Sequence, residues 1–356
     1  MADEHGSISK LAESLRVQPG RKVDLGRDFD PASTPDFVAK EESQELLRRG
    51  IEILTDLQAR LAAQDTYGLL VVVQGIDASG KDGTIKHVMS GVNPQGVAVH
   101  SFKSPSAQEL DHDYLWRCAQ HLPARGEIAI FNRSHYEEVL VVRVHAEYLT
   151  GQKLPEESKG RDIWKRRYRE INDWERYLVD NGFRVVKLFL NLSKEEQRRR
   201  FLDRIDQPDK RWKFSLGDVR ERERWDAYQE AFSAMLSATS TTWAPWHVIP
   251  ADHKWFARVA AAAVIIDALT DIDPRYPVLD EKAQRSLMQA RAELAAEADP
   301  EEAPEPSAEA SQPPAAAGAG ANGGKKRKGD GRAAKKRKGK KDNKSGKTKK
   351  SGKKRK

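Results

Sequence analysis

The feature that most constrains the fold is a short apolar run followed by a glycine-rich segment and then a helical pattern. Residues 69–73 are continuously apolar and rich in valine, which is typical of a strand covered on both faces. Gly75 and the pair Gly80-Lys81 follow with the G-x-x-x-x-G-K spacing of a phosphate-binding loop. Apolar residues then recur at helical spacing over 85–92. This order of strand, loop and helix predicts a chain built around a parallel sheet.

The loop and the first turn of the following helix supply the groups expected to hold phosphate. Glycines let the backbone N–H groups curl around phosphate oxygens at a helix N-terminus, and Lys81 adds a mobile positive charge. A plain strand–helix turn without a ligand is the alternative interpretation. Besides Lys81, the predicted phosphate-binding residues are Gly75, Ala78, Ser79, Gly80, Asp82, Gly83 and Thr84.

Two carboxylates in this segment, Asp77 and Asp82, are the candidate metal ligands. A Ser or Thr hydroxyl usually follows the loop lysine and holds Mg²⁺, whereas Asp82 follows Lys81 here. Carboxylate oxygens suit a hard divalent cation, so we predict a site for Mg²⁺, or alternatively Mn²⁺. Asp82 could equally serve only to complement the helix dipole, which makes Asp77 the stronger candidate.

A second strand, predicted at 127–131, ends in polar residues beside the phosphate loop, because parallel strands end at the same edge of a sheet. Asn132 stands where an Asp would be expected, which leaves more of the metal binding to Asp77. Arg133 and Glu137 are four residues apart and could form a stabilising ion pair. Arg133 could equally neutralise a transferring phosphoryl group, and its location favours that role.

A cationic segment follows the strand predicted at 185–190. Mobile cationic segments at this place close over the substrates of phosphotransferases as a lid, and a solvated helix face is the alternative. Trp212, within this segment, is expected to pack in the lid hinge, with stacking on a base as the alternative. The lid, at about 198–224, is predicted to use Arg198, Arg200, Arg204, Lys210, Arg211 and Lys213.

The rest of the chain continues to alternate strands with helices. Further strands are predicted at 97–102 and 246–250. The pattern predicts an α/β fold of the phosphate-loop type: a three-layer α/β/α sandwich with a parallel sheet of about five strands and a helical lid. We expect residues 1–40 to form an irregular N-terminal arm and residues 41–292 to form the phosphate-loop kinase domain.

The net charge of +8 is distributed unevenly along the chain. Residues 325–356 contain 19 Lys and Arg against 2 Asp, whereas residues 1–292 contain 43 basic and 45 acidic residues. Residues 293–356 have too few apolar side chains to fold and are expected to be a disordered Ala/Pro/Glu linker and Lys-rich tail. Such a tail binds polyanions by counterion release, so contact of 325–356 with nucleic acid or another polyanion is expected.

Other features exclude several classes of protein. No apolar run is long enough to span a bilayer, and no basic-then-apolar leader opens the chain. A single cysteine, Cys118, excludes an internal disulfide framework. We therefore expect a cytoplasmic protein without membrane contact.

Three ordered motifs stand out along the chain: residues 75–84, residues 131–139, and residues 210–214 followed by Gly217-Asp218. They resemble those of the family 2 polyphosphate kinases, and the resemblance extends over about residues 17–277. The family moves a phosphoryl group between inorganic polyphosphate and a nucleotide, with Mg²⁺ and without a phosphoenzyme, so the resemblance implies the same activity here.

The resemblance also implies roles for single residues. It assigns Lys81 to the phosphate chain, Asp77 to the neighbourhood of the metal and Arg133 to the transferring group. At position 137 the branch restricted to one nucleotide tends to have Asn, whereas Glu137 is similar to the third class, which accepts both AMP and ADP. These four residues are the candidate catalytic residues.

The predicted function is direct in-line transfer between polyphosphate and nucleoside mono- and diphosphates, from AMP to ADP and from ADP to ATP. Members of the family are often dimers or tetramers, so a homo-oligomer is expected. Two alternatives remain at this point: an ATP-dependent kinase of a small substrate, and a nucleic-acid-associated protein acting through its basic tail. Asp82 after the loop lysine argues against the first of these.

Overall fold

The computed structural model describes residues 2–297, except the side chains of residues 2–5 and 213. Among the described residues, the chain divides into two units, the first ending at Arg285 and the second beginning at Ser286. The described part of the second unit consists of residues 286–297, most of them in α13 (Glu281–Ala296). The predicted Lys-rich tail lies outside the described residues, and the predicted linker lies outside them from residue 298 on.

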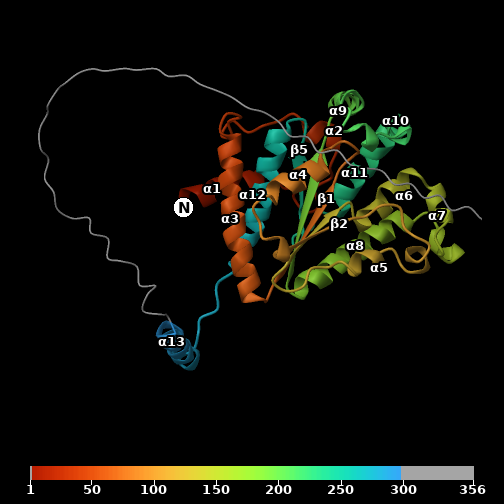
Figure 1. Cartoon of the computed structure of the whole chain (residues 1–356). Coiled ribbons are helices and arrows are strands. Elements are labelled where there is room, and N and C mark those ends of the chain that lie inside the picture. Colours follow the sequence, from red (N-terminus) through yellow and green to blue (C-terminus); the bar gives the residue numbers. More distant parts are fainter. Residues whose placement is uncertain (1, 298–356) are drawn as a thin grey trace, which may run out of the picture. The chain divides into compact units, whose positions relative to one another are not determined.

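Within the described residues, five parallel strands form one sheet in the order β2-β3-β1-β4-β5, which confirms the predicted α/β fold with a parallel sheet of about five strands. Figure 1 labels β1, β2 and β5. In the register of the sheet, Val73 lies opposite Asn132 on one side and Leu188 on the other. The carboxyl ends of the three central strands therefore meet at one edge. The strands are β1 (Gly68–Gln74), β2 (Val97–Ser101), β3 (Ile128–Asn132), β4 (Phe183–Asn191) and β5 (Trp246–Pro250).

Alternate residues of β1 face two different helical layers. Leu69, Val71 and Val73 pack in one apolar cluster, and Leu70 and Val72 pack in the other. Because both faces are covered, every residue of β1 is buried and the strand can be apolar throughout. The first layer contains α1 (Ala2–Ser14), α3 (Ser43–Gln64), α4 (Lys81–Val88) and α12 (Lys254–Ile272); the second contains α8 (Ile163–Asp180) and α11 (Trp225–Thr239).

The N-terminal segment differs from the irregular arm that the sequence predicted for residues 1–40. Helix α1 packs into the first apolar cluster. The backbone N–H of Val17 then donates to the carbonyl of Trp246, and the N–H of Val248 donates to the carbonyl of Leu15. The segment thus covers the outer edge of β5. Its helix was missed because its few apolar residues gain their burial only from this contact.

Short helices and 3₁₀ segments connect the strands and the long helices. The remaining α-helices are α2 (Leu25–Asp28), α5 (Trp116–Ala119), α6 (Val141–Val144), α7 (Glu147–Thr150), α9 (Lys194–Asp206) and α10 (Leu216–Glu221). The 3₁₀ segments are η1 (Pro94–Gly96), η2 (Glu109–Asp111), η3 (His135–Val139), η4 (Glu156–Lys159), η5 (Arg211–Lys213) and η6 (Arg222–Arg224). Within residues 2–297, no helix combines the length and apolar character needed to cross a membrane.

Candidate active site at the carboxyl edge of the sheet

The loop at 75–80 joins β1 to α4 through backbone conformations that favour glycine. Gly75 has a φ of +149° and Gly80 a φ of +101°. A Cβ atom at Gly75 would also lie 2.8 Å from the carbonyl oxygen of Leu190, so this position has no room for a side chain. Gly80 is the N-cap of α4, and the first N–H groups of that helix therefore begin at the loop, as a phosphate site requires.

Lys81 folds back over the loop. Its ammonium donates to the carbonyl of Gly75 at 2.7 Å and to that of Ile76 at 3.2 Å, and the residue is only 8% exposed. Burial, assisted by the nearby charge of Arg133 and opposed by three carboxylates, lowers its pKa to about 8. The charge expected to be mobile is thus held inside the loop, where an entering phosphate oxygen would compete with the two carbonyls.

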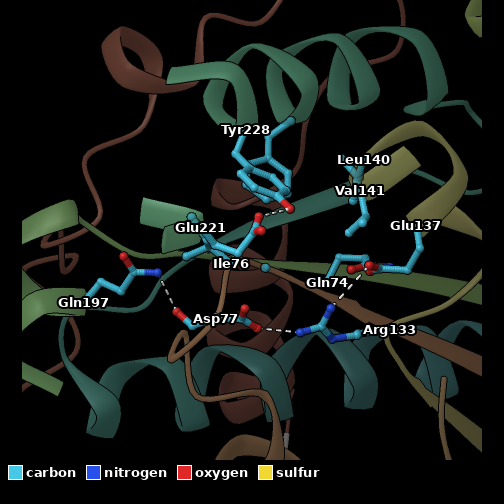
Figure 2. Close-up of a pocket in the computed structure, with 12 residues that line it drawn as sticks. Gln74, Ile76, Asp77, Arg133, Glu137, Leu140, Val141, Gln197, Glu221 and Tyr228 are labelled. Atoms are coloured by element: carbon cyan, nitrogen blue, oxygen red, sulfur yellow. Dashed lines mark hydrogen bonds and ion pairs between the residues drawn. The ribbon is translucent and has the colours of Figure 1, made fainter. Parts of the chain in front are cut away.

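Arg133 lies between two carboxylates at the end of β3 (Figure 2). Its guanidinium donates to Asp77 Oδ1, and its second nitrogen lies 3.4 Å from Glu137 Oε2. Its backbone has a φ of +63°, a left-handed conformation that few non-glycine residues adopt. Burial opposes its charge, but Glu137 and Asp77 outweigh that effect and raise the pKa of Arg133. The ion pair considered from the sequence is present, and Asp77 is its second acceptor.

The two candidate metal ligands are held by different partners. Asn132 donates its side-chain N–H to Asp82 Oδ1 at 2.7 Å, while Asp77 accepts from Arg133. Within the described residues, no group of three or more His, Cys, Asp or Glu side chains is arranged to hold a metal. One or two carboxylates nevertheless fit Mg²⁺, which commonly completes its octahedron with water and substrate phosphates.

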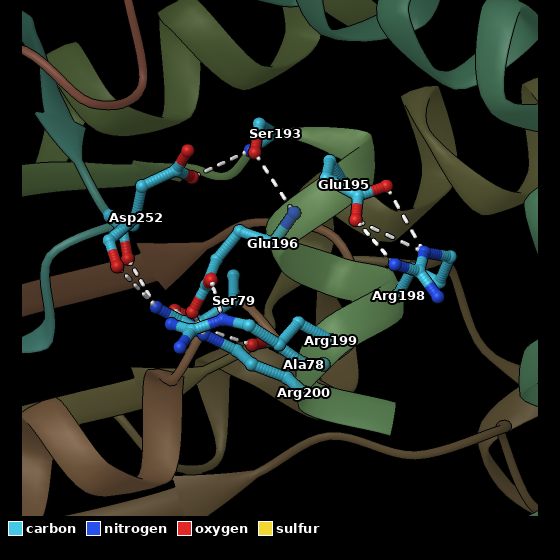
Figure 3. Close-up of polar contacts among 10 residues, drawn as sticks. Ala78, Ser79, Ser193, Glu195, Glu196, Arg198, Arg199, Arg200 and Asp252 are labelled. Carbon is cyan, nitrogen blue, oxygen red and sulfur yellow. Dashed lines mark hydrogen bonds and ion pairs between the residues drawn. The ribbon is translucent and has the colours of Figure 1, made fainter. Parts of the chain in front are cut away.

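Arg200 was predicted to be a lid cation, but its side chain is buried and holds the phosphate loop (Figure 3). It lies on α9 and is 6% exposed. Its Nε donates to Glu196 Oε1 at 2.7 Å. The sequence could not show this role, because the three consecutive arginines at 198–200 are chemically identical. The guanidinium donates to four backbone carbonyls, those of Ala78, Ser79, Ala251 and Asp252.

The other predicted lid cations lie on more exposed parts of 198–224. Arg204 lies 3.5 Å from Asp218 and so links α9 to α10. Trp212 is 77% exposed, which contradicts its predicted packing in the lid hinge. The side chain of Lys213 is outside the described set. The remaining cations make local contacts: Arg198 with Glu195, Lys210 with Gln207 and Arg211 with the carbonyl of Ile205.

A pocket lined by both polar and apolar side chains opens beside Arg133 (Figure 2). Two of its polar groups were not predicted: Glu221 accepts a hydrogen bond of 2.9 Å from the hydroxyl of Tyr228. Burial, followed by the charge of Glu221, raises the pKa of Tyr228, so this hydroxyl stays protonated. Glu221 is the last residue of α10, within the predicted lid, and Tyr228 lies on α11, just after it. No local motif distinguishes either residue. The apolar lining consists of Ile76, Leu140, Val141 and Phe232.

A second cavity of about 460 Å³ is lined by Glu138 of η3 and by residues of the segments 105–117 and 152–170. Burial raises the pKa of Glu138, which accepts a hydrogen bond of 2.7 Å from Gln152. The guanidinium carbon of Arg167 lies 3.9 Å from the ring centroid of Tyr114. Carboxylates outnumber cations in the lining: Glu109, Asp111, Asp113, Glu138 and Glu170 against Arg117, Lys153 and Arg167.

Known proteins are similar to this chain in both sequence and fold. Residues 37–277 match the family described as polyphosphate kinase 2. The ADP-polyphosphate phosphotransferase of Rhodopseudomonas palustris is 47% identical over 283 residues, covering 79% of this chain and 98% of the relative. The AMP/ADP-polyphosphate phosphotransferase of Meiothermus ruber is 44% identical over 281 residues, covering 78% and 100%. The crystal structure of polyphosphate kinase 2 from Arthrobacter aurescens superimposes with a TM-score of 0.70 and 39% identity over 79% of this chain and 96% of that one.

The anchoring role of Arg200 predicts that two adjacent arginines differ in their effect on stability. Arg200→Met leaves buried carbonyls without a partner and removes one of the two arginines that pair with Glu196, so we expect the free energy of unfolding to fall by about 3 kcal/mol. Arg199→Met is the matched control, because Arg199 also pairs with Glu196 but its side chain is 63% exposed; its loss should be under about 0.5 kcal/mol. Urea unfolding measures both, and equal losses would contradict the assignment.

The lowered pKa of Lys81 predicts a pH-dependent contribution to folding. Between a folded pKa of about 8 and the ordinary value of 10.5, the unfolded chain binds more protons, so the stability of the wild type rises with pH. Lys81→Met lacks this titrating group. We therefore expect the unfolding free energy of the wild type, minus that of Lys81→Met, to rise by up to about 1.4 kcal/mol per pH unit above pH 8. Denaturant titrations of both proteins from about pH 7 to about pH 10 measure this shift. A difference that stays constant would contradict the lowered pKa.

Proposed function

The chain belongs to the polyphosphate kinase 2 family, and from that premise we propose that it transfers phosphoryl groups between inorganic polyphosphate and nucleotides, forming ATP from ADP and ADP from AMP. The observation that carries this proposal is the meeting of Lys81, Arg133 and the loop at 75–80 at one edge of the sheet, within the residues that match the family. Two named relatives, an ADP- and an AMP/ADP-polyphosphate phosphotransferase, support it.

The proposed reaction is a direct in-line displacement. An oxygen of the terminal phosphate of the acceptor nucleotide attacks the terminal phosphorus of polyphosphate, and the bond from that phosphorus to the bridging oxygen breaks. The shortened polymer leaves with the electron pair of that bond. Such a transition state demands positioning and charge neutralisation more than covalent chemistry, so no nucleophilic side chain is required. Lys81 and Arg133 supply two of the positive charges.

Lys81 has to exchange partners for this reaction. In the structure its ammonium is bound to two loop carbonyls. A phosphate oxygen is a stronger, charged acceptor than a carbonyl, so binding of polyphosphate would draw the ammonium toward the loop opening. An anion in the loop would also raise the pKa of Lys81 and keep it charged during turnover.

A divalent cation would complete the site, and we propose Mg²⁺, with Mn²⁺ as an alternative. When bound, such an ion would neutralise negative charge that develops on the phosphate oxygens. Asp77 and Asp82 would hold it with their carboxylates. Asp77 is already paired with Arg133, so its carboxylate would interact with both the guanidinium and the divalent cation. Asn132 would keep Asp82 oriented through its amide.

We propose that the nucleoside of the acceptor occupies the second cavity. Its volume of about 460 Å³ lies in the range of small-ligand sites. Five carboxylates against three cations would repel polyphosphate but accept hydrogen bonds from ribose hydroxyls or an exocyclic amine. Glu137 lines the pocket beside Arg133, and its neighbour Glu138 lines this cavity. Segment η3 would therefore separate the phosphate-binding side from the nucleoside-binding side.

The lid and the tail enter the proposal through their charge. We propose that residues 198–224 close over bound phosphates, bringing Arg204 and the cations at 210–213 toward the site. The tail at 325–356, with 19 basic residues, would retain long polyanions such as polyphosphate, with an affinity that falls as salt rises.

The test of the function is phosphorylation of ADP and of AMP by the purified chain, with Mg²⁺ and long-chain polyphosphate as the sole phosphoryl donor. We expect ATP from ADP, and both ADP and ATP from AMP, when the nucleotides are separated by chromatography. Lys81→Met is the control and should lower turnover by a factor of about 100 or more. Absence of product from polyphosphate, together with turnover of ATP on a small acceptor, would establish an ATP-dependent kinase and refute the proposal.

Acceptor choice should depend on Glu137, which lies beside Arg133 in the pocket. Glu137→Asn removes the negative charge, and we expect the ratio of AMP to ADP turnover to fall at least tenfold, which corresponds to about 1.4 kcal/mol. Glu137→Asp keeps the carboxylate and is the matched control, with a ratio close to that of the wild type. Steady-state rates with each acceptor at saturating polyphosphate measure the ratio. An unchanged ratio in the Asn variant would remove Glu137 from acceptor selection.

A further inference from the structure

A charged pair is buried behind the segment that carries Arg133 and Glu137. Lys187 of β4 and Glu175 of α8 lie 2.6 Å apart, and neither side chain has any exposed surface. Removing two ions from water costs several kcal/mol for each of them, and their attraction offsets this only when every remaining donor and acceptor is satisfied. The partners of this pair therefore indicate what it holds in place.

The pair is completed by Tyr136 and by one backbone carbonyl. Lys187 Nζ donates to the hydroxyl of Tyr136 at 2.9 Å and to the carbonyl of Thr239 at 2.7 Å. The same hydroxyl donates to Glu175 Oε1 at 2.7 Å. All three ammonium hydrogens are thus used, and both oxygens of Glu175 have a partner. Strand β4, helix α8, the end of α11 and η3 are connected through one charge.

Tyr136 connects this cluster to the segment that carries Arg133 and Glu137. It lies in η3 between Arg133 and Glu137, and its backbone N–H donates to Ser134 Oγ at 3.2 Å. Ser134 Oγ also accepts from the side chain of Gln74, which lines the pocket beside Arg133. The turn that places Arg133 and Glu137 is therefore held by the buried pair on one side and by the end of β1 on the other.

We propose that Lys187, Glu175 and Tyr136 are positioning residues for the phosphoryl transfer, acting by fixing η3 so that Arg133 and Glu137 keep their places. This inference rests on the proposed function for its kinetic consequences. The cluster has no exposed surface, so none of its members touches a substrate. Stability alone does not account for it, because apolar residues of similar volume commonly replace a buried ion pair without loss of stability.

The test uses the double variant Lys187→Met/Glu175→Leu in the full chain, which removes both charges and keeps most of the side-chain volume. We expect kcat to fall at least tenfold, the KM for polyphosphate to change less than threefold, and the ratio of AMP to ADP turnover to change, since Glu137 loses its fixed position. Tyr136→Phe, which removes one hydroxyl, is a milder second variant and keeps the test available if the double variant does not fold. It should lower kcat at least threefold.

Leu178→Ala is the matched control for a merely structural effect. Leu178 lies one turn further along α8 and is buried in the apolar cluster, so its truncation should lower the thermal midpoint by about 5–10 °C without altering kcat or the acceptor ratio. Folded variants of the cluster with wild-type kcat and a wild-type acceptor ratio would overturn the proposal.

A crystal structure of the double variant separates this inference from the proposed function. We expect η3 to shift and the contact between Arg133 and Asp77 to be lost, whatever the enzyme phosphorylates. An unchanged η3 would overturn the positioning role even if polyphosphate is the donor. An inactive wild type with a displaced η3 in the variant would instead refute the proposed function alone.

Discussion

A loop that offers its N–H groups to a ligand needs other partners for its carbonyl groups, and this requirement organises the site. Each carbonyl at 75–79 has a side-chain donor. Lys81 serves the first two, Gln197 donates to that of Asp77 at 2.9 Å, and Arg200 serves the last two. Gln197 and Arg200 lie one turn apart on α9. The loop is therefore held open from behind by a helix about 120 residues later in the chain.

The two cations at the loop act differently because their surroundings differ. Arg200 donates to four carbonyls and to Glu196. Lys81 has two carbonyl partners and a pKa lowered to about 8 by burial. Under the proposed function, an incoming phosphate would replace the two carbonyl partners of Lys81, whereas Arg200 would keep its four carbonyls and Glu196. The first is an exchangeable charge and the second a structural one.

Local patterns predicted the central strand, the phosphate loop and the polar end of β3, because these features depend on neighbouring residues. Contacts between distant residues were beyond such patterns. Lys187 lies in the middle of a predicted strand, where a lysine usually marks a solvent-facing position, and only Glu175 and Tyr136 explain its burial. Arg200 is likewise one of three adjacent arginines. It contacts the loop because it lies on the face of α9 that packs against the loop carbonyls. The predictions therefore fail where the partner comes from another element.

The carbonyl contacts also limit how a lid could move. The first half of α9 is fixed, since Gln197 and Arg200 hold the loop and Phe201 is buried in the helix. From Leu202 onward the side chains are mostly exposed. A closing motion that carried the first half of α9 would pull the donors away from the loop carbonyls and spoil the phosphate site as it closed. In the proposed closure, the moving part of residues 198–224 would therefore begin after Phe201, so that the later cations approach a loop that stays in place.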